Sequence, residues 1–362
     1  MSAPRPEPPR AEAGPSGLTL RAAAPADAEG IAALFADVFR RGCSADRVRW
    51  KLFETPAAVA QPSFVALCDG RVVGQYAATP TRFWAGGRER VGLHGCDVMT
   101  APSFRRRGVL TSLGERAHAE WRGAGLAFVT GLANAAWGTR SAALGWVEVF
   151  PLRWMVALLA PERVAALRTG VPALARLKGA GRAWSALATF RAERDRSVSV
   201  EAAASAGPEL DELWEACRGT LDLSVVRDRA WVDWRYVRAP GTPYRLLVAR
   251  RGGRAVGYAV FTITDAERGH GVLAELFAAR GDEGARAELL RAASGALRDA
   301  GAVRVSTLAL PGSTEARSLL RAGFFPRARY MFEVVPLAAD VPVETLSSPA
   351  LWMLAPGDFD VV

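Results

Sequence analysis

The chain has 362 residues, half of them hydrophobic, and a formal net charge of +9. This length is enough for two ordinary domains, each with a well-buried core. The four cysteines, at positions 43, 68, 96 and 217, form no C-x-x-C pair and have no clustered histidines beside them. This spacing excludes a clustered thiolate metal site and predicts reduced, buried thiols.

The charge pattern argues against nucleic acid as a partner. Nearly all basic residues are arginines, with lysine only at positions 51 and 178, and they are scattered, as a biased genome composition produces. A net positive field still favours an anionic ligand. Residues 1–17 are rich in proline and charge, which predicts a disordered tail rather than a signal peptide, and the longest apolar run, at 154–160, is too short to cross a bilayer. We therefore expect a cytoplasmic protein without membrane contacts.

The first elements are a strand at 18–22 and two helices. The helices cover about 24–39 and 44–53, and Ser44 is the expected cap of the second. Strands at 63–67 and 72–77 flank Asp69-Gly70, a specific hairpin signal. The chain then continues as an antiparallel meander toward residue 93.

Residues 93–116 carry the most informative pattern. An extended apolar run at 96–100 is stopped by Ala101-Pro102, passes through Arg105-Arg106-Arg107-Gly108, and continues as a helical pattern from Val109. Such a turn points several backbone N–H groups and a helix N-terminus at one spot beside guanidinium charge, which suits a pyrophosphate. The spacing matches neither a P-loop nor a dinucleotide fingerprint. Taken alone, such a turn is more often a plain strand–helix connection with solvated arginines. Its assignment as a phosphate-binding site therefore depends on the pattern in the rest of the chain.

Beyond this helix, the pattern predicts a strand at 126–130, a helix at 138–144 and a strand at 147–156. Asn134 lies between the first two. Residues 157–198 are rich in Ala, Leu and Arg, and predict short amphipathic helices. A basic amphipathic segment can lie on a membrane surface, but a linker packed on both domains is the favoured interpretation.

Residues 100–110, Thr-Ala-Pro-Ser-Phe-Arg-Arg-Arg-Gly-Val-Leu, resemble the acyl-CoA signature of the GNAT superfamily of N-acyltransferases. In that signature a strand is followed by Arg/Gln-x-x-Gly-x-Gly/Ala, and Leu110 departs from the final small residue. The resemblance implies a GNAT fold over 18–156, whose central strands, here 96–100 and 126–130, splay apart around the pantetheine arm of acetyl-CoA. Asn134 matches a pantetheine- or adenosine-binding position, with a loop-capping role equally open. The implied cofactor-binding residues are Val98, Met99, Thr100, Arg105, Arg106, Arg107, Gly108, Val109, Leu110 and Asn134.

An internal repeat begins near residue 198. Residues 232–236 match 48–52, and residues 251–259 match 68–76, which implies a second GNAT-like module. Its cofactor turn holds Asp282-Glu283, and negative charge there repels a pyrophosphate. The predicted fold is therefore α/β, of the α+β mixed-sheet kind, with two tandem GNAT-like modules. The predicted ranges are a tail at 1–17, a catalytic module at 18–156, a helical linker at 157–198, a degenerate module at 199–337 and a docked tail at 338–362.

The sequence offers three candidate catalytic residues, Asp97, Ser141 and Asp360. Asp97 lies in an apolar strand, where it is either a general base or a carboxylate held by a neighbouring backbone or Arg group. The resemblance implies a thiolate-protonating tyrosine at the position of Ser141, which is a poor acid. Asp360, with Asp358, lies in an apolar tail that should dock on a domain. There the carboxylates would recognise an amine or take its proton, or else the tail would only cover an apolar face of the second module. His118 and His270 are expected to play no catalytic part.

The leading hypothesis is an acetyl-CoA-dependent N-acetyltransferase acting on the amine of a small molecule or a sugar-like acceptor. The alternative is a non-catalytic acyl-CoA-binding or structural protein of the same fold. An aminoacyl-transferase of the tandem cell-wall type would need a stronger basic groove for transfer RNA. A homodimer is compatible with the sequence, and no metal is expected.

Overall fold

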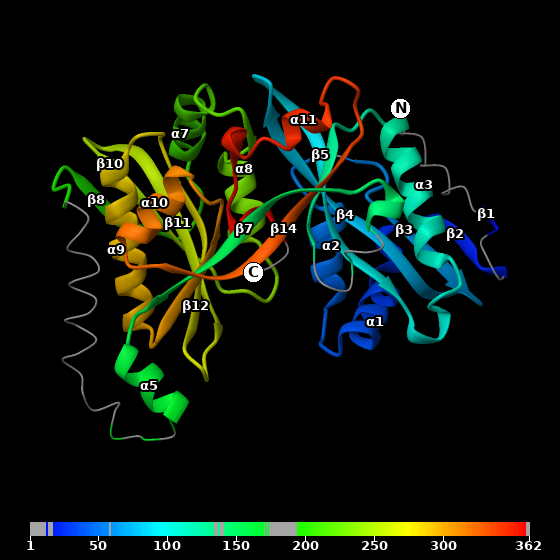
Figure 1. Cartoon of the computed structure of the whole chain (residues 1–362), viewed down its shortest axis with the longest axis horizontal. Coiled ribbons are helices and arrows are strands. Elements are labelled where there is room, and N and C mark those ends of the chain that lie inside the picture. The colour runs from blue at the N-terminus through cyan, green and yellow to red at the C-terminus, as the bar shows by residue number, and fades with distance from the viewer. Residues whose placement is uncertain are drawn as a thin grey trace, which may run out of the picture. The chain divides into compact units, whose positions relative to one another are not determined.

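The computed structural model describes residues 12–13, 17–57, 59–133, 137, 141–169, 171, 173 and 194–359. They form two compact units (Figure 1). Unit 1 takes in the described residues of 1–82, 90–148 and 333–346, and unit 2 those of 83–89, 149–332 and 347–362. Each unit is thus assembled from segments far apart in the sequence.

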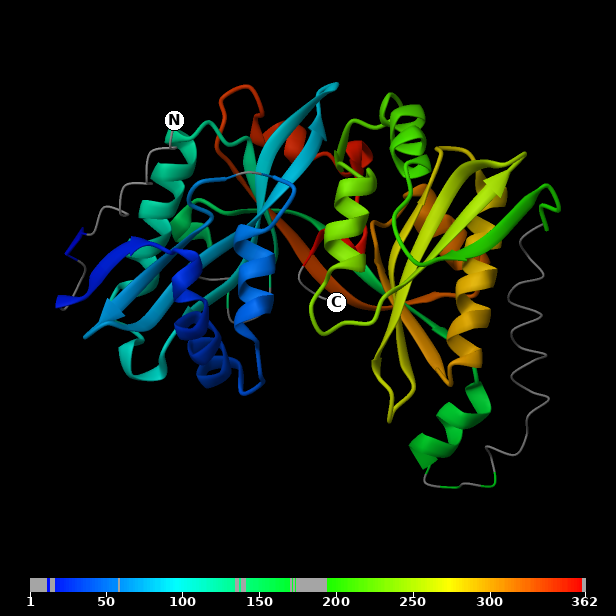
Figure 2. The same cartoon turned by 180° about the vertical axis from the view of Figure 1, so that it is seen from behind.

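Unit 1 is a sheet covered by helices, with strand order β1-β2-β3-β4-β5-β6-β14. Helix α3 lies on the face seen in Figure 1, while α1 and α2 lie on the face seen in Figure 2. Its elements, in chain order, are β1 (Glu12–Ala13), β2 (Thr19–Ala22), η2 (Pro25–Asp27), α1 (Ala28–Phe39), α2 (Ala45–Phe53), β3 (Ser63–Cys68), β4 (Arg71–Ala85), β5 (Arg88–Thr100), η3 (Pro102–Phe104), α3 (Val109–Gly123), β6 (Phe128–Ala133), η4 (Ala142–Leu144), the end of β14 (Phe325–Pro336) and α11 (Val343–Leu346).

Unit 2 has the strand order β14-β7-β13-β12-β11-β10-β8, with β9 paired to β15 and to the end of β4. Its remaining elements are β7 (Val147–Leu158), α5 (Pro161–Thr169), β8 (Val198–Ala203), α7 (Glu209–Arg218), β9 (Leu223–Val225), α8 (Arg229–Val232), η6 (Asp233–Val237), β10 (Arg245–Arg251), β11 (Arg254–Asp265), β12 (His270–Ala278), α9 (Glu283–Asp299), β13 (Arg304–Ala309), α10 (Thr314–Arg321), η7 (Pro349–Leu351), β15 (Trp352–Met353) and η8 (Pro356–Asp358).

The mixed α/β fold expected from the sequence is confirmed, and so is the first hairpin. Asp69 and Gly70 have φ of 48° and 77°, and Cys68 pairs with Arg71 across them. Two positive φ angles define a two-residue turn of the type that Asp-Gly favours. The close approach of α3 to the sheet depends on Gly74, because a Cβ there would lie 2.7 Å from the Val109 side chain.

The two units share local geometry where the sequence repeats. Gly252 and Gly253, with φ of 56° and 82°, form the matching hairpin, across which Arg251 pairs with Arg254. Each hairpin contains a register shift two residues before the turn, between Ala66 and Leu67 in unit 1 and between Ala249 and Arg250 in unit 2. Helices α2 and α8 begin at matching side-chain caps, Ser44 and Asp228.

The division into units departs from the contiguous ranges predicted from the sequence. Strand β7 runs antiparallel to β13, with Val305 opposite Ala157, so residues 149–158 belong to unit 2. Residues 333–346 belong to unit 1, where β14 lies beside β6. The last strand of each sequence repeat therefore completes the sheet of the other unit.

Other expectations are tested only in part. Glu12–Ala13, within the predicted tail, pairs with β2, and α5 covers part of the predicted linker. The remaining residues of 1–16, 138–140 of the predicted helix and 174–193 of the linker lie outside the described residues. None of the helices in the described part of the chain combines the length and hydropathy needed to span a bilayer.

Candidate active site

The turn before α3 has the backbone geometry of an anion-binding site. Arg106 and Gly108 have φ of 62° and 76°, and Gly108 is the N-cap of α3. Left-handed residues in such a turn direct successive N–H groups to one side, and the helix N-terminus adds partial positive charge. Arg105, Arg106 and Arg107 are all exposed around it. The turn fits the pyrophosphate of a CoA-like ligand.

The uncharged residues of the predicted cofactor site differ in burial. Met99 and Val109 are buried, whereas Val98 and Thr100 are half-buried on β5. Leu110 packs against the hydrophobic core of unit 1, so its larger side chain does not occupy the turn. Asn134 lies outside the described residues.

The central strands β5 and β6 are paired over a short stretch. Leu93 pairs with Val129, and His94 with Thr130. Just beyond, Trp146 lies against both strands, because a Cβ on Gly95 or Gly131 would fall 2.9 Å or 2.8 Å from its indole ring. Trp146 therefore packs where the two strands end their pairing.

Asp97 combines two unusual features. Its φ is 45°, a left-handed conformation inside a strand, and its carboxylate forms an ion pair with Lys51 of α2. The Lys51 and Asp97 side chains are only 4% and 7% exposed. A carboxylate must find a partner when buried, and Lys51 is one such partner of Asp97. Lys51 was missed by sequence reasoning, although it is one of only two lysines in the chain.

Ser141 is buried beside a carboxylate from a distant strand. Its Oγ donates to Glu333 Oε1 at 3.3 Å, and Trp137 Nε1 donates to Glu333 Oε2 at 2.9 Å. Glu333 belongs to the part of β14 that lies in unit 1. No sequence signal links positions 141 and 333, because the pairing depends on β14 leaving its own sequence repeat.

His118 is part of a buried hydrogen-bond chain. Trp146 Nε1 donates to the Tyr76 hydroxyl at 2.8 Å, which lies 2.9 Å from His118 Nε2. Burial lowers the pKa of His118 to about 4, with the Arg122 charge adding to the effect. At neutral pH this imidazole is uncharged, and it links α3 to β4 through the Tyr76 hydroxyl.

Unit 2 fills the corresponding helix N-terminus with its own side chains. Asp282 caps α9, with Oδ1 accepting a hydrogen bond from Ala285 N at 2.9 Å. Arg251 donates to both Asp282 oxygens, at 2.6 and 3.0 Å, and to Asp195 at 2.8 Å. A carboxylate paired with a guanidinium thus takes the place that a ligand phosphate would need.

Unit 2 also fills the region near its central strands. Here β12 and β13 pair only from His270 to Val272, and η8 of the C-terminal tail contacts both strands. Gly357 packs against the Ala274 carbonyl oxygen, and a Cβ there would overlap the Tyr236 hydroxyl. The tail therefore occupies, in unit 2, the region where a ligand would lie between splayed strands.

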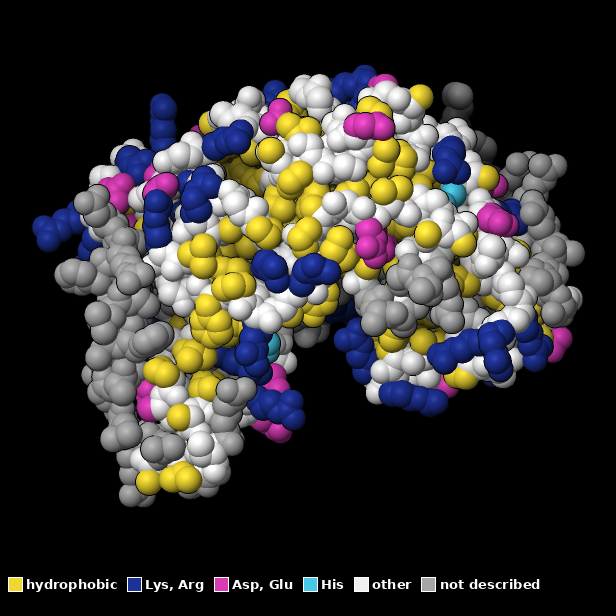
Figure 3. Space-filling view, in the orientation of Figure 1, with side chains coloured by type: hydrophobic (Ala, Val, Ile, Leu, Met, Phe, Trp, Pro, Cys, Tyr) yellow, Lys and Arg dark blue, Asp and Glu magenta, His cyan; other side chains and the backbone are white. Residues whose placement is uncertain are grey.

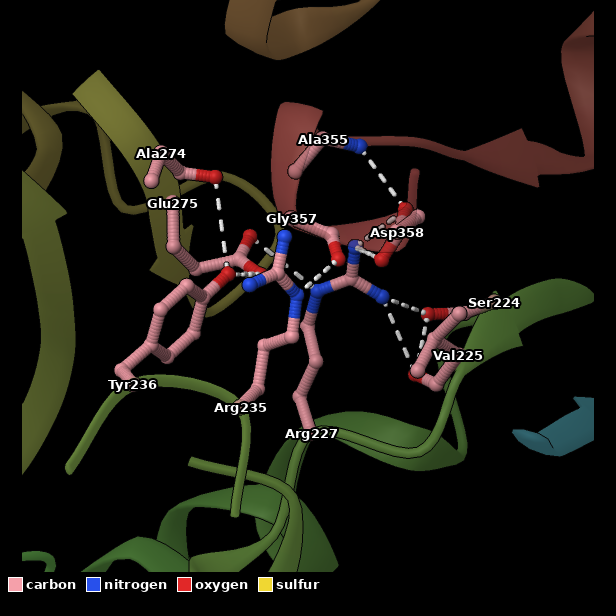
Figure 4. Close-up of polar contacts among 10 residues, drawn as sticks. All are labelled: Ser224, Val225, Arg227, Arg235, Tyr236, Ala274, Glu275, Ala355, Gly357 and Asp358. Carbon is pink, nitrogen blue, oxygen red and sulfur yellow. Dashed lines mark hydrogen bonds and ion pairs between the residues drawn. The ribbon is translucent and has the colours of Figure 1, made fainter. Parts of the chain in front are cut away.

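Buried charges anchor this tail (Figure 4). Arg227 Nη2 donates to both carboxylate oxygens of Asp358, at 2.7 and 2.8 Å, and Arg227 Nε lies 3.3 Å from Glu275 Oε1. Arg235 donates to the carbonyl oxygens of Gly357 and Phe359 at 2.9 and 3.1 Å. Burial, opposed by the Arg227 charge, raises the pKa of Glu275 to about 7. We call Arg227, Glu275 and Asp358 the Arg227 cluster.

The role suggested for the tail carboxylates changes accordingly. Asp358 is 6% exposed and bound to Arg227, so it cannot recognise an acceptor amine while the tail is docked. Its burial and pairing make it an anchor. Asp360 lies outside the described residues.

On the face shown in Figure 3, Lys and Arg side chains form small groups separated by hydrophobic and acidic ones rather than one continuous tract. Within the described ranges, no group of three or more His, Cys, Asp or Glu side chains is placed to hold a metal ion.

Comparison with known proteins gives a family match within unit 1. Residues 19–145 match the family profile described as Acetyltransferase (GNAT) domain. This part of the chain is therefore similar to GNAT acetyltransferase domains. Comparison with curated proteins gave no match.

Solved structures show the same fold over most of the chain. A probable N-acyltransferase from Enterococcus faecalis has a TM-score of 0.63 at 13% identity, and a GCN5-related N-acetyltransferase from Anabaena variabilis has 0.62 at 12%. Eis1 from Mycobacterium abscessus has 0.54 at 16%. Each match covers 88% of this chain and 73% of the other. At such identities the likeness establishes the fold and leaves the acceptor open.

Proposed function

We propose that unit 1 transfers the acyl group of acetyl-CoA to the amine of a small-molecule or sugar-like acceptor. The observation that carries this proposal is the turn at Gly108, which is exposed, basic and left-handed at the N-terminus of α3. The corresponding turn in unit 2 is filled by Asp282 and Arg251. We therefore expect one acetyl-CoA per chain, bound by unit 1.

When bound, acetyl-CoA supplies an acyl thioester. The residues of the chain then have three tasks: to hold the donor, to polarise the thioester carbonyl and to accept the proton of the acceptor amine. Backbone N–H groups of residues 98–100, next to the left-handed Asp97, are candidates for the polarising donor. Asp97 is the candidate proton acceptor, and the ion pair with Lys51 fixes its carboxylate at that position.

The test is calorimetric titration of CoA, followed by transfer assays with a panel of amines. We expect one site per chain in the wild type and a loss of affinity of at least about a hundredfold in Gly108→Asp, because a carboxylate and a Cβ would meet the pyrophosphate. Replacing Arg106 or Arg107 should weaken binding by roughly 1–3 kcal/mol if its guanidinium contacts phosphate.

Unit 2 offers the matched control. Gly281 precedes α9 with φ of 89°, so Gly281→Asp makes the same change at the corresponding turn. It should leave CoA affinity unchanged. Two equivalent sites, or equal losses in both variants, would contradict the assignment to unit 1. Binding without transfer to any amine would favour the non-catalytic alternative.

A further inference from the structure

Three polar atoms in the core of unit 1 are buried without a hydrogen bond to protein. They are Ser63 Oγ on β3 and both amide atoms of Gln75, Oε1 and Nε2, on β4. Both side chains are 0% exposed, and none of the three atoms has a hydrogen-bond partner among the described residues. Because the amide oxygen and the amide nitrogen are both unpaired, turning the amide over would leave the same two atoms unsatisfied.

The strand register brings these two side chains together. Ser63 pairs with Ala77 and Val65 pairs with Gln75, so Ser63 and Gln75 are diagonal neighbours in the antiparallel pair of β3 and β4. Residues two apart on a strand point to the same face, and diagonal neighbours lie about 7 Å apart. The serine hydroxyl and the glutamine amide therefore share one face of the sheet at a spacing that a water molecule can bridge.

This face is the one that α1 and α2 cover. Tyr76, next to Gln75 on β4, points to the opposite face, where its hydroxyl lies 2.9 Å from His118 of α3. Helices α1 and α2 lie on the other side of the sheet from α3 (Figure 2). Lys51 of α2 reaches Asp97 of β5 from that side, so the buried ion pair and the unpaired polar atoms occupy the same layer of unit 1.

Unit 2 has a buried polar group at the matching strand position. Tyr258 follows the second turn glycine, Gly253, by the same number of residues as Gln75 follows Gly70. Its hydroxyl is also 0% exposed and has no hydrogen-bond partner in the described part of the chain. The phenol interacts electrostatically with the Arg227 cluster. Both repeats thus direct a polar side chain into the layer that holds their buried charges.

The physical chemistry of burial favours hydration of the group in unit 1. An amide that leaves water without gaining a hydrogen bond is strongly unfavourable in a protein core. Internal waters remove this cost, and each typically makes about three hydrogen bonds to otherwise unpaired groups. The Gln75 amide offers a donor and an acceptor, and the Ser63 hydroxyl offers either.

We propose that unit 1 contains an internal water site bound by Ser63 and Gln75. The water accepts a hydrogen bond from Gln75 Nε2 and donates one to Ser63 Oγ, while Gln75 Oε1 accepts from the same water or from a second one. The site links β3 to β4 through side chains in addition to their backbone hydrogen bonds. It does not depend on the proposed function, because it uses only groups of the folded chain.

The direct test is a high-resolution crystal structure of the full wild-type chain. We expect electron density for a water within hydrogen-bond distance of both Gln75 Nε2 and Ser63 Oγ. In solution, oxygen-17 relaxation dispersion counts long-lived internal waters, and Gln75→Met should lower this count by at least one. Thr81→Val is the matched control on β4, because the Thr81 hydroxyl is 2% exposed but already donates to the Thr79 carbonyl oxygen at 3.1 Å. It should leave the count unchanged.

A double-mutant cycle in urea unfolding tests whether the two side chains share the water. Once Ser63→Ala or Gln75→Met has displaced it, the second substitution should cost less. We therefore expect the unfolding equilibrium constant of the double variant to differ at least about threefold from the value that the single variants predict together. Thr81→Val combined with Gln75→Met should be additive, because these side chains share no partner.

The wild-type crystal structure distinguishes a hydrated from a dry site even if a variant fails to fold. Absence of water density between the two side chains, or a direct hydrogen bond between Ser63 and Gln75, would overturn the proposal. So would an unchanged count of internal waters in a folded Gln75→Met chain, or an additive cycle. None of these results would bear on acyl transfer by unit 1.

Discussion

The N-termini of α3 and α9 follow the central strands of the two units, but they are satisfied in different ways. Gly108 leaves the first terminus exposed and surrounded by arginines. Asp282 caps the second and is itself held by Arg251. A helix N-terminus attracts any anion, whether a ligand or a side chain of the same protein. The same arrangement, a turn that leads into a helix N-terminus, is therefore open to a ligand in unit 1 and occupied by the Asp282 carboxylate in unit 2.

The same contrast extends to the central strands. In unit 1 the carboxylate of Asp97 faces Lys51. In unit 2 the residue that matches Lys51 in the repeat is Arg235, and it binds carbonyl oxygens of the docked tail. Unit 2 therefore uses its matching position to hold part of its own chain, which is a structural role.

The largest expected loss of stability comes from a variant that removes the anchor of the tail. Arg227→Met leaves the buried carboxylates of Glu275 and Asp358 without their shared cation. Removing one member of a buried ion pair typically costs about 3–5 kcal/mol. We expect urea unfolding to detect this loss, and hydrogen exchange to localise reduced protection to unit 2, including η8.

Arg229→Met is the control for that experiment. Arg229 is two residues away, but its side chain is 53% exposed and lies 3.7 Å from Asp211. Its replacement should change stability little. If Arg227→Met were as mild, or if unit 1 lost protection first, the Arg227 cluster would not be the anchor of the tail.

A smaller effect concerns pH, which should act on the two units in opposite directions. His118 has an ordinary pKa of 6.5 that burial lowers to about 4, so its contribution to stability is present above pH 6.5 and is lost as the pH falls toward 4. Glu275 has an ordinary pKa of 4.5 that burial raises to about 7, so its contribution is present below pH 4.5 and is lost as the pH rises through 7. Each effect is on the order of 3 kcal/mol.

Hydrogen exchange between pH 4 and 8 would assign each change to its unit. His118→Gln should remove the loss of stability at acid pH in unit 1 alone. Glu275→Gln should remove the loss of stability as the pH rises through 7 in unit 2 alone. If both variants changed the pH dependence of the same unit, the two buried groups would not act on separate units.

The sequence predicted the features that depend on neighbours along the chain. Asp69-Gly70 indicated a hairpin because both residues tolerate positive φ, and the Ser44 cap and the turn at Gly108 were equally local. Asp282 was placed correctly in the turn before α9, although its Arg251 partner was not predicted.

The features that depend on distant segments could not be predicted in this way. Glu333 reaches Ser141 only through the exchange of β7 and β14, and hydrophobic alternation within a strand does not specify which sheet it joins. The left-handed conformation of Asp97 could not be predicted, because the residue lies inside an apolar strand and is not itself a glycine. Lys51 could have been singled out by composition, because a lysine is rare in this arginine-rich chain.

The smallest effect would test how closely the two hairpins correspond. Asp69 and Gly252 occupy the first position of matching turns, with φ of 48° and 56°. Asparagine adopts such left-handed angles more readily than most residues, and glycine loses more chain entropy on folding. Gly252→Asn should therefore stabilise unit 2, and Asp69→Gly should destabilise unit 1, each by about 0.4–1 kcal/mol in urea unfolding. Gly253 has φ of 82° at the second turn position, which prefers glycine. Gly253→Asn should therefore stabilise unit 2 less than Gly252→Asn does. Changes of the same sign in Gly252→Asn and Asp69→Gly would mean that the two turns, despite their shared φ angles and register shifts, are under different constraints.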